Sequence, residues 1–334
     1  LSYAAVVFLL GPFLILTGAA QSPALEAQFP WYSRLFGGRQ RARSLHFLGL
    51  LAVLAFTLVH TAMVIITGLG RNLGDIILGT DRTSSQGLAI ALGVLVIVAI
   101  LAIYALTSWA SLRAPRPAQH ALGAVIRPPM RLLTNETRSR QEYSEKDISP
   151  VFLVNGKPPS SPEFLALMWQ DFSGYRLEVN GRVKHPLSLS LDDLRTLPKQ
   201  TQITQHNCIQ GWSGVAEWSG TPLAHVLDLC EPDAEARYAV FWSFSRDTRG
   251  EMFYEVIPLT VAHHPQTLLA YEMNGKPLPL AHGAPLRLRA ETLLGYKMTK
   301  WIHSIELVEE YAAIREGQGG SREDNLHYEL YAAI

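Results

Sequence analysis

The sequence predicts an all-α transmembrane helical region followed by a soluble α+β domain that is mostly β. Three long uncharged runs lie before residue 112, most of the charge follows it, and short strand-like runs bounded by turn residues begin near residue 151. The 334 residues suffice for two domains. We therefore expect a membrane domain over 1–112, a linker over 113–150 and a soluble domain over 151–334.

The overall composition excludes several classes of protein. The 29 Lys and Arg residues balance 29 Asp and Glu residues, so the basic surplus that nucleic-acid binding needs is missing and we expect no nucleic-acid partner. Two cysteines, Cys208 and Cys230, are too few for the disulfide framework of a small secreted fold. The sequence contains neither a GxGxxG motif that opens a βαβ unit nor a GxxxxGK[ST] motif, so dinucleotide and P-loop sites have no support.

The uncharged runs predict three membrane-spanning helices, at residues 1–20, 45–70 and 87–110. A secretory signal peptide would supply a single, shorter run. The chain opens on Leu within the first run, so we expect further residues upstream. Segments flanking these helices on one side hold eight arginines, against two in the loop 71–86. The positive-inside rule therefore favours a cytoplasmic C-terminal half.

Two histidines lie within the second run. His46 and His60 are fourteen residues apart, which places them within roughly 40° on one helix face and about 21 Å apart along the axis. Two haems stacked across a bilayer each need one axial histidine in this arrangement. A histidine that contacts a polar group of a neighbouring helix would show the same pattern. The other two runs contain no histidine, so second axial ligands would come from elsewhere.

The first 70 residues resemble the di-haem cytochrome b anchors of bacterial formate dehydrogenases and hydrogenases, in which a helix ending in a Thr-Gly pair (Thr17-Gly18 here) precedes a helix with this histidine pair. The resemblance implies haem b, a multi-pass protein of the bacterial inner membrane, and electron exchange with the quinone pool in the lipid bilayer. It also implies that the C-terminal half lies outside, against the loop charges, so the side of the membrane stays open.

The soluble half shows alternating apolar runs and short helical patterns. We expect strands at 175–183, 236–244, 285–290 and 300–310, and helices at 189–197 and 222–230. The linker 113–150 is rich in Arg and Pro and then polar, without a sustained apolar period, so we expect a tether over the membrane surface.

Among the expected loops, 205–220 (QHNCIQGWSGVAEWSG) holds the side chains best suited to catalysis or metal binding. Cys208 stands beside His206 and Asn207 and before a Gly-Trp-Ser-Gly turn. A lone cysteine is more often a small buried apolar residue. A cysteine hydrolase would need a positioned histidine base, and a thiolate could instead bind a soft metal.

Residues 150–334 resemble the sulfite oxidase superfamily of molybdenum enzymes. The matching segments are NCIQGWSG around Cys208, LLAYEMNGKPLPLAHGAPLRL at 268–288 and GYKMTKWI at 295–302. The resemblance implies an α+β molybdopterin domain with mixed sheets, in which Cys208 is the protein ligand to molybdenum beside the dithiolene sulfurs of molybdopterin. Positions implied to hold this cofactor are His282, Arg287, Lys297, Met298, Thr299 and Lys300, with weaker matches at Phe152, Asn155 and Ser243.

A catalytic tyrosine near molybdenum matches Tyr254 only if a gap of one residue is allowed, and a core aromatic is the alternative. Arg246 and Arg249 could meet substrate or simply face solvent. Arginines that hold sulfite in sulfite oxidases are replaced here, one by Val154 and one within Cys208–Trp212. The Cys-x-x-x-Trp-Ser pattern resembles instead the branch that contains the catalytic subunit of protein-methionine-sulfoxide reductase.

The sequence thus predicts a membrane-bound, molybdopterin-dependent oxidoreductase that transfers an oxygen atom from an S- or N-oxide, small or protein-bound, and exchanges electrons with quinone through haem b. A sulfite dehydrogenase of the same superfamily is one alternative. A non-catalytic haem b subunit that transfers electrons or anchors a partner is the other.

Overall fold

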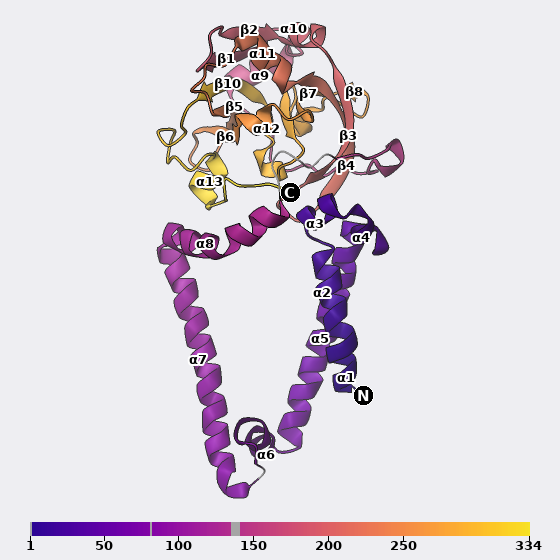
Figure 1. Cartoon of the computed structure of the whole chain (residues 1–334), viewed down its shortest axis with the longest axis vertical. Helices are drawn as coiled ribbons and strands as arrows, with labels where there is room; N and C mark the ends of the chain where they lie inside the picture. Colours follow the sequence, from indigo (N-terminus) through magenta and orange to yellow (C-terminus); the bar gives the residue numbers. More distant parts are fainter. Residues whose placement is uncertain (1, 81, 135–140) are drawn as a thin grey trace. The chain divides into compact units, whose positions relative to one another are not determined.

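The computed structural model describes residues 2–80, 82–134 and 141–334. These fall into two compact units, one of Leu1–Ser22 with Trp31–Pro129 and one of Pro23–Pro30 with Met130–Ile334. The first unit is helical and the second is built on two sheets (Figure 1). A helical region followed by a mixed-sheet domain is the order that the sequence predicts.

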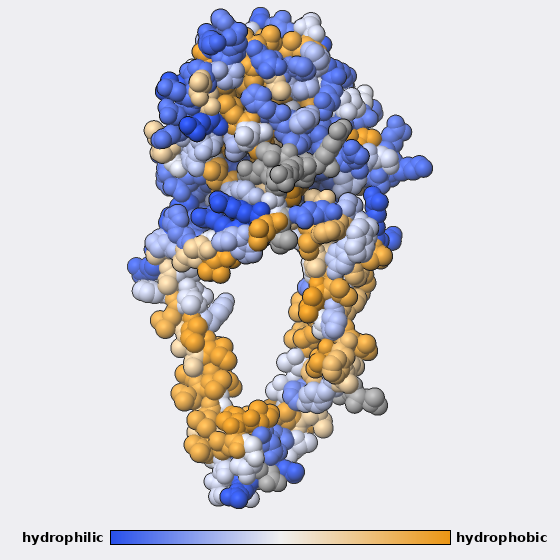
Figure 2. Space-filling model, in the orientation of Figure 1, coloured by the Kyte–Doolittle hydropathy of each residue, from blue (hydrophilic) through white to orange (hydrophobic). Residues whose placement is uncertain are grey.

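The helical unit contains two helices that are long and apolar enough to cross a membrane, Arg39–Ile66 and Thr83–Arg113. The first is α5, and the second combines the short helix η3 (Thr83–Ser85) with α7 (Gln86–Arg113). Hydrophobic side chains cover α5 and α7 along most of their length (Figure 2). Between these helices lie α6 (Leu69–Leu73) and the π-helical turn η2 (Gly74–Leu78). The predicted runs at 45–70 and 87–110 therefore coincide with long apolar helices.

The first predicted run forms a shorter apolar helix, Tyr3–Ala19, in which α1 (Ser2–Ala5) and α2 (Gly11–Ala19) flank the π-helical turn η1 (Val6–Leu10). It packs on α5, where a Cβ at Gly49 would lie 2.6 Å from Leu14 Cδ2. The absence of a side chain at Gly49 lets the two helices approach closely. Two short helices follow, α3 (Pro23–Gln28) and α4 (Pro30–Leu35).

The first half of the expected linker 113–150 is helical, because Pro115–Leu133 forms the helix α8. At 100° per residue, Arg116, His120 and Arg127 share one face, and Leu122 and Val125 lie on the opposite one. The apolar residues of this segment thus recur with the period of a helix, but its prolines favoured an irregular linker. Pro115 begins the helix, and Pro128 and Pro129 lie within it. The short 3₁₀ helix η4 (Glu145–Asp147) follows.

The second unit contains two five-stranded sheets. The first has the order β2-β1-β10-β5-β6, in which β1 (Arg176–Gly181) and β10 (Ile302–Val308) are parallel and all other pairs are antiparallel. The other strands of this sheet are β2 (Leu187–Ser190), β5 (Tyr238–Arg246) and β6 (Met252–Pro258). The second sheet has the order β3-β4-β7-β8 with β9 paired to β7, from β3 (Gln200–Asn207), β4 (Ser213–Pro222), β7 (Thr267–Met273), β8 (Lys276–Pro277) and β9 (Arg287–Ala290).

One hydrophobic core joins the two sheets. Leu177 and Phe241 come from the first sheet and Leu269 and Leu288 from the second, and all four are fully buried in one cluster. Five short helices, named α9 to α13, accompany the strands: α9 (Pro162–Trp169), α10 (Leu191–Thr196), α11 (Leu223–Cys230), α12 (Leu259–Ala262) and α13 (Ser321–Leu326). The strands and helices expected in this half are confirmed, each within a few residues of its predicted bounds.

The segment 205–220 differs from the expected long loop. Residues up to Asn207 complete β3 and those from Ser213 begin β4, so only Cys208–Trp212 form the connection. The two strands form an antiparallel hairpin in register from Gln200 to Asn207. Cys208 therefore lies on a tight turn fixed by a sheet.

Candidate functional site

The turn that carries Cys208 is closed by its own backbone. The Cys208 N–H donates to the Trp212 carbonyl at 3.0 Å, and the Gly211 N–H donates to the Cys208 carbonyl at 3.0 Å. Gly211 has a φ of +88°, which a residue with a side chain rarely adopts. The thiol is only 4% exposed, and the Asn155 amide donates to its sulfur at 3.3 Å.

The Cys208 thiol faces a cavity of about 390 Å³, a volume within the range of small-molecule sites. Its walls come from segments distant in the sequence: the loop before α9, the β3–β4 turn, the β5–β6 connection, the stretch before β9, the stretch before β10, and α13. Nine of the predicted site residues line it: Phe152, Asn155, Cys208, Ser243, His282, Arg287, Met298, Thr299 and Lys300. The structure thus brings most of the predicted cofactor positions together around one thiol.

Two predicted site residues do not reach this cavity. The Tyr254 hydroxyl donates to Asp324 Oδ2 at 2.6 Å, and its ring packs beside Val240 and Val256 in a separate apolar cluster. Lys297 is buried between the carboxylates of Glu255 and Glu323. The expectation that these two side chains line the site is therefore corrected: both lie behind its wall, where burial and hydrogen bonding hold them.

The lining of the cavity is strongly cationic. Burial, followed by the charges of Arg287 and Arg322, lowers the pKa of Lys300 to about 7. Burial, followed by Arg287 and Lys300, lowers the pKa of His282 to about 4. Lys300 also joins two walls, since its Nζ donates to the carbonyls of Asn155 at 2.6 Å and Ala281 at 2.9 Å. Because neighbouring cations as well as burial lower these pKa values, an anionic ligand would favour the charged form of Lys300, so the cavity suits an anion.

Two buried polar atoms in this wall lack a hydrogen-bond partner among the described residues: Arg287 Nε and Thr299 Oγ1. Arg287 is 3% exposed, stacks at 4.7 Å on the Trp218 ring and uses Nη1 to donate to the His282 carbonyl. A buried donor without an acceptor is costly, so these atoms fit a ligand that brings oxygen acceptors. The phosphate of molybdopterin brings such oxygens, and the Cys208 thiolate suits a soft metal. The residues present therefore fit this cofactor.

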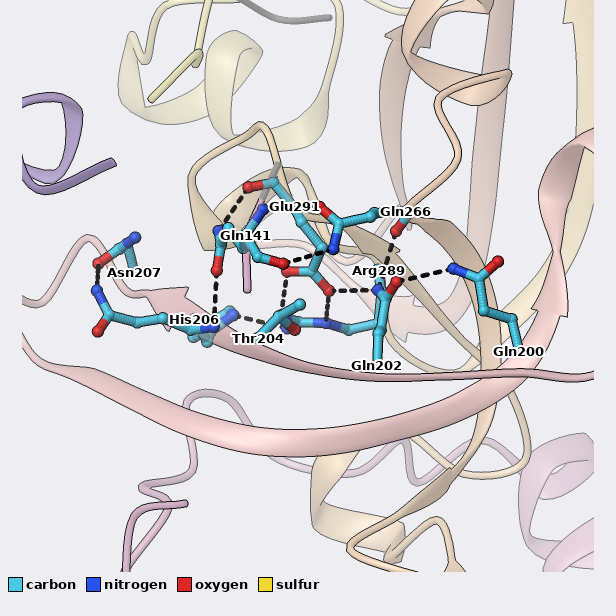
Figure 3. Close-up of polar contacts among 10 residues, drawn as sticks. Gln141, Gln200, Gln202, Thr204, His206, Asn207, Gln266, Arg289 and Glu291 are labelled. Atoms are coloured by element: carbon cyan, nitrogen blue, oxygen red, sulfur yellow. Dashed lines mark hydrogen bonds and ion pairs between the residues drawn. The ribbon is translucent and has the colours of Figure 1, made fainter. Parts of the chain in front are cut away.

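A buried polar network holds His206 (Figure 3), which lines the same cavity as Cys208. Arg289, fully buried, donates from Nε and Nη2 to the Glu291 carboxylate at 2.8 and 2.6 Å and from Nη1 to His206 Nδ1 at 3.0 Å. A guanidinium only donates, so Nδ1 is the acceptor and the neutral ring carries its hydrogen on Nε2. Burial, followed by the charge of Arg289, lowers the pKa of His206 well below its usual value. The network thus fixes the tautomer and orientation of a residue that lines the cavity.

Sequence reasoning missed much of the outer wall, because Phe253, Arg322 and Asn325 also line the cavity. Of the two arginines that could meet substrate, Arg246 lines the cavity, whereas Arg249 pairs with Glu316 outside it. No motif marks α13, so only the fold reveals that it closes the site.

The two histidines of α5 have hydrogen-bond partners on the N-terminal helical segment. Thr17 Oγ1 donates to the Phe13 carbonyl at 2.8 Å, so His46 Nδ1 donates to Oγ1 at 3.1 Å and its Nε2 remains the nitrogen that could bind a metal. A hydrogen bond of 2.7 Å joins His60 Nδ1 to the Tyr3 hydroxyl. The same hydroxyl lies 3.4 Å from His60 Nε2.

Comparison with known proteins gives matches to parts of the chain. Residues 166–314 match the family described as oxidoreductase molybdopterin binding domain. The putative protein-methionine-sulfoxide reductase subunit YedZ1 of Azospira oryzae is 37% identical over 141 residues, which are 42% of this chain and 52% of that protein. The protein-methionine-sulfoxide reductase catalytic subunit MsrP of Xanthomonas axonopodis is 35% identical over 148 residues, 41% of this chain and 46% of that protein.

The chain thus spans about half the length of the curated relatives that it matches. Among solved structures, the sulfane dehydrogenase SoxCD of Paracoccus pantotrophus matches with 23% identity and a TM-score of 0.37, over 41% of this chain and 39% of that one.

Proposed function

We propose that this protein is a membrane-bound, molybdenum-dependent oxidoreductase that reduces S-oxides, because residues 166–314 match the oxidoreductase molybdopterin binding domain family. The observation that carries the proposal is the Cys208 thiol on its closed turn, facing a cationic cavity whose buried Arg287 Nε and Thr299 Oγ1 lack partners. Both curated relatives described above are named as subunits of protein-methionine-sulfoxide reductases, which favours a methionine sulfoxide as the substrate.

In this proposal, Cys208 binds the metal and Arg287, Thr299 and Lys300 bind the phosphate of the cofactor. When bound, the molybdenum centre supplies two-electron oxygen-atom transfer. The Asn155 amide, which donates to the Cys208 sulfur, stabilises the thiolate form of that ligand. His206 presents Nε2–H as a hydrogen-bond donor in the same wall, and Phe152 and Trp212, whose rings lie 5.8 and 5.5 Å from its own, limit the access of water.

We further propose that α5 and α7 cross the bacterial inner membrane and that His46 and His60 each bind a haem b, which passes single electrons from quinone. Each helix has 28 residues and is about 42 Å long, more than the roughly 30 Å of a hydrocarbon core. The basic and apolar faces of α8 suit a helix lying at the membrane surface. The flanking arginines favour the cytoplasmic face for the oxidoreductase domain. Proteolysis of the 113–150 segment from outside intact spheroplasts would contradict that orientation.

Metal analysis and spectroscopy of the full chain in detergent test both cofactors. We expect about one molybdenum per wild-type chain and haem b bands after dithionite reduction. Cys208→Ser loses molybdenum and keeps the haem bands. Cys230→Ser is the matched control, because Cys230 is equally buried but lies on α11 and does not line the cavity. Equal molybdenum in both variants would refute the assignment of Cys208, and His46→Leu with unchanged haem would refute that of His46.

Turnover assays separate the candidate reactions. We expect reduction of methionine sulfoxide with reduced viologen as the electron donor. Sulfite oxidation is a second candidate. The arginines that hold sulfite in sulfite oxidases are replaced here, which disfavours this reaction, but Arg246 and Arg322 bring other arginines to the cavity. A loaded enzyme that oxidises sulfite and ignores sulfoxides would replace the first candidate with the second. Haem without molybdenum, in a host that makes the cofactor, would refute the enzyme altogether.

A further inference from the structure

Arg322 is a cation of the cavity wall without a polar partner. Its guanidinium lies 5.9 Å over the Phe253 ring, and no hydrogen bond or ion pair joins it to another side chain of the described residues. Its neighbour Asn325 also lines the cavity, but donates to Asp247 at 2.9 Å. Arg322 is therefore available to a ligand on the side of the cavity formed by α13.

The charges around Arg322 do not balance. Five Lys and Arg side chains line the cavity, against the carboxylate of Asp247 and, in the metal-bound state, the thiolate of Cys208. That carboxylate already accepts from the backbone N–H groups of Arg249 and Glu251 and from Asn325. A phosphate monoester brings at most about two negative charges at neutral pH. Positive charge thus remains in the cavity when one phosphate is bound there, whichever of these cations contact it.

The backbone on both sides of Arg322 is anchored from behind the wall. Ser321 Oγ accepts from the Tyr254 N–H at 3.0 Å, Glu323 pairs with buried Lys297, and Asp324 accepts from the Tyr254 hydroxyl at 2.6 Å. These contacts fix the residues immediately before and after Arg322. Arg322 is therefore presented to the cavity from a helix whose backbone is already ordered, so binding a ligand need not order the main chain.

We propose that Arg322 is an anion-binding residue of this cavity that takes an oxyanion of the carboxylate or phosphate type, and that Tyr254 and Lys297 are positioning residues that hold it in place. Two sources could supply the oxyanion: the phosphate of the cofactor, or a carboxylate carried by the substrate. The second source rests on the function proposed above, since it names an acidic group on the sulfoxide.

The cofactor arm compares the molybdenum and molybdopterin content of the full chain with that of Arg322→Gln, Arg322→Lys and the control Arg249→Gln. Arg249 forms an ion pair with Glu316 and does not line the cavity. If Arg322 binds the cofactor phosphate, we expect at least a threefold loss of molybdopterin in Arg322→Gln, partial recovery in Arg322→Lys, and no loss in the control.

The substrate arm uses N-acetylmethionine sulfoxide and its neutral amide, which differ only at the carboxylate. If Arg322 binds that group, the ratio of the two KM values shifts by about 10- to 100-fold in Arg322→Gln, the size expected for a lost charge-assisted hydrogen bond. The molybdenum content then stays at the wild-type level. Tyr254→Phe shifts the same ratio in the same direction, whereas a purely structural role would lower the Tm and leave the ratio unchanged.

A binding arm remains valid if the proposed function fails. Calorimetry of the cofactor-free full chain with inorganic phosphate should show a Kd at least fivefold weaker in Arg322→Gln than in wild type or Arg249→Gln. If a loaded wild type reduces neither sulfoxide, the proposed function fails and this arm still decides the anion site. An unchanged phosphate Kd together with unchanged cofactor content, and an unchanged KM ratio wherever turnover is seen, would overturn the proposal.

Discussion

Substituting Gly295 with alanine tests whether the position of His206 is as constrained as its contacts imply. A Cβ at residue 295 would lie 2.2 Å from His206 Cε1, 2.4 Å from Nε2 and 3.1 Å from the Asn207 carbonyl. The backbone at Gly295 is outside the left-handed region, so the cost is one of space alone. To reach van der Waals contact near 3.5 Å, the imidazole has to retreat by about 1 Å.

The imidazole has little room for that movement. It is 6% exposed and accepts the hydrogen bond from Arg289 at 3.0 Å. Overpacking costs about 1–3 kcal/mol, and breaking a buried hydrogen bond to a charged group costs about 1.5–3 kcal/mol. We expect Gly295→Ala to destabilise the domain by about 3–5 kcal/mol, which lowers the Tm of a unit of this size by roughly 10 °C.

Thermal unfolding of the full chain in detergent, followed by tryptophan fluorescence, measures this shift. Gly174→Ala is the control, since a Cβ there meets its nearest atom, Leu167 Cδ2, at an ordinary 3.6 Å. In a His206→Ala background the clash disappears, so Gly295→Ala should there cost less than about 1 kcal/mol, a double-mutant coupling that isolates the contact. The reasoning is refuted if Gly295→Ala melts with the control, or if its cost persists without the imidazole.

Two further outcomes follow from buried charges. Lys297→Met leaves the carboxylates of Glu255 and Glu323 together without a cation, which should lower the free energy of unfolding in urea by about 3–5 kcal/mol. Burial and the charge of Glu323 raise the pKa of Glu255 well above its usual value, so this loss of stability should shrink on acidification. A loss that does not change with pH would argue against this explanation. In the cofactor-free chain, Lys300 has a pKa of about 7 against about 10.4 when unfolded, so between these values the unfolded state binds the extra proton and stability rises with pH. Lys300→Met should flatten this rise, and an equal slope in both proteins would contradict the assignment.

The elements of the second unit follow from local pattern to a large extent. Alternation in IHSIELV places Ile305 and Leu307 in the core, as the period of two requires. Ile302 reaches the same core because the strand is irregular between Ile302 and Ser304. The hairpin of β3 and β4 was harder to predict, because its strands QTQITQHN and SGVAEWSGTP are polar or carry Gly and Pro. Their burial comes from pairing with each other and with β7, a long-range effect that the composition of either strand does not express.

The site shows the same division between local and long-range information. The segments around Cys208, Arg287 and Lys300 carry enough residues in fixed order to be matched, and they meet at the cavity. The prediction that Tyr254 lies in the site was wrong because side chains alternate along a strand. Phe253 faces the cavity, and Tyr254, the next residue of β6, points to the opposite side. The match to this tyrosine needed a gap of one residue, and in a strand one residue changes the face.

The position of α13 after the other walls of the cavity in the sequence has a consequence for how the protein matures. The loop before α9 and the β3–β4 turn are synthesised first, and the wall that carries Arg322 is synthesised after them. Until that segment docks against Tyr254 and Lys297, the cavity stays open on one side and the carboxylate of Glu255 has only part of its final environment. Docking of α13 is therefore the step that completes the wall of the cavity on that side.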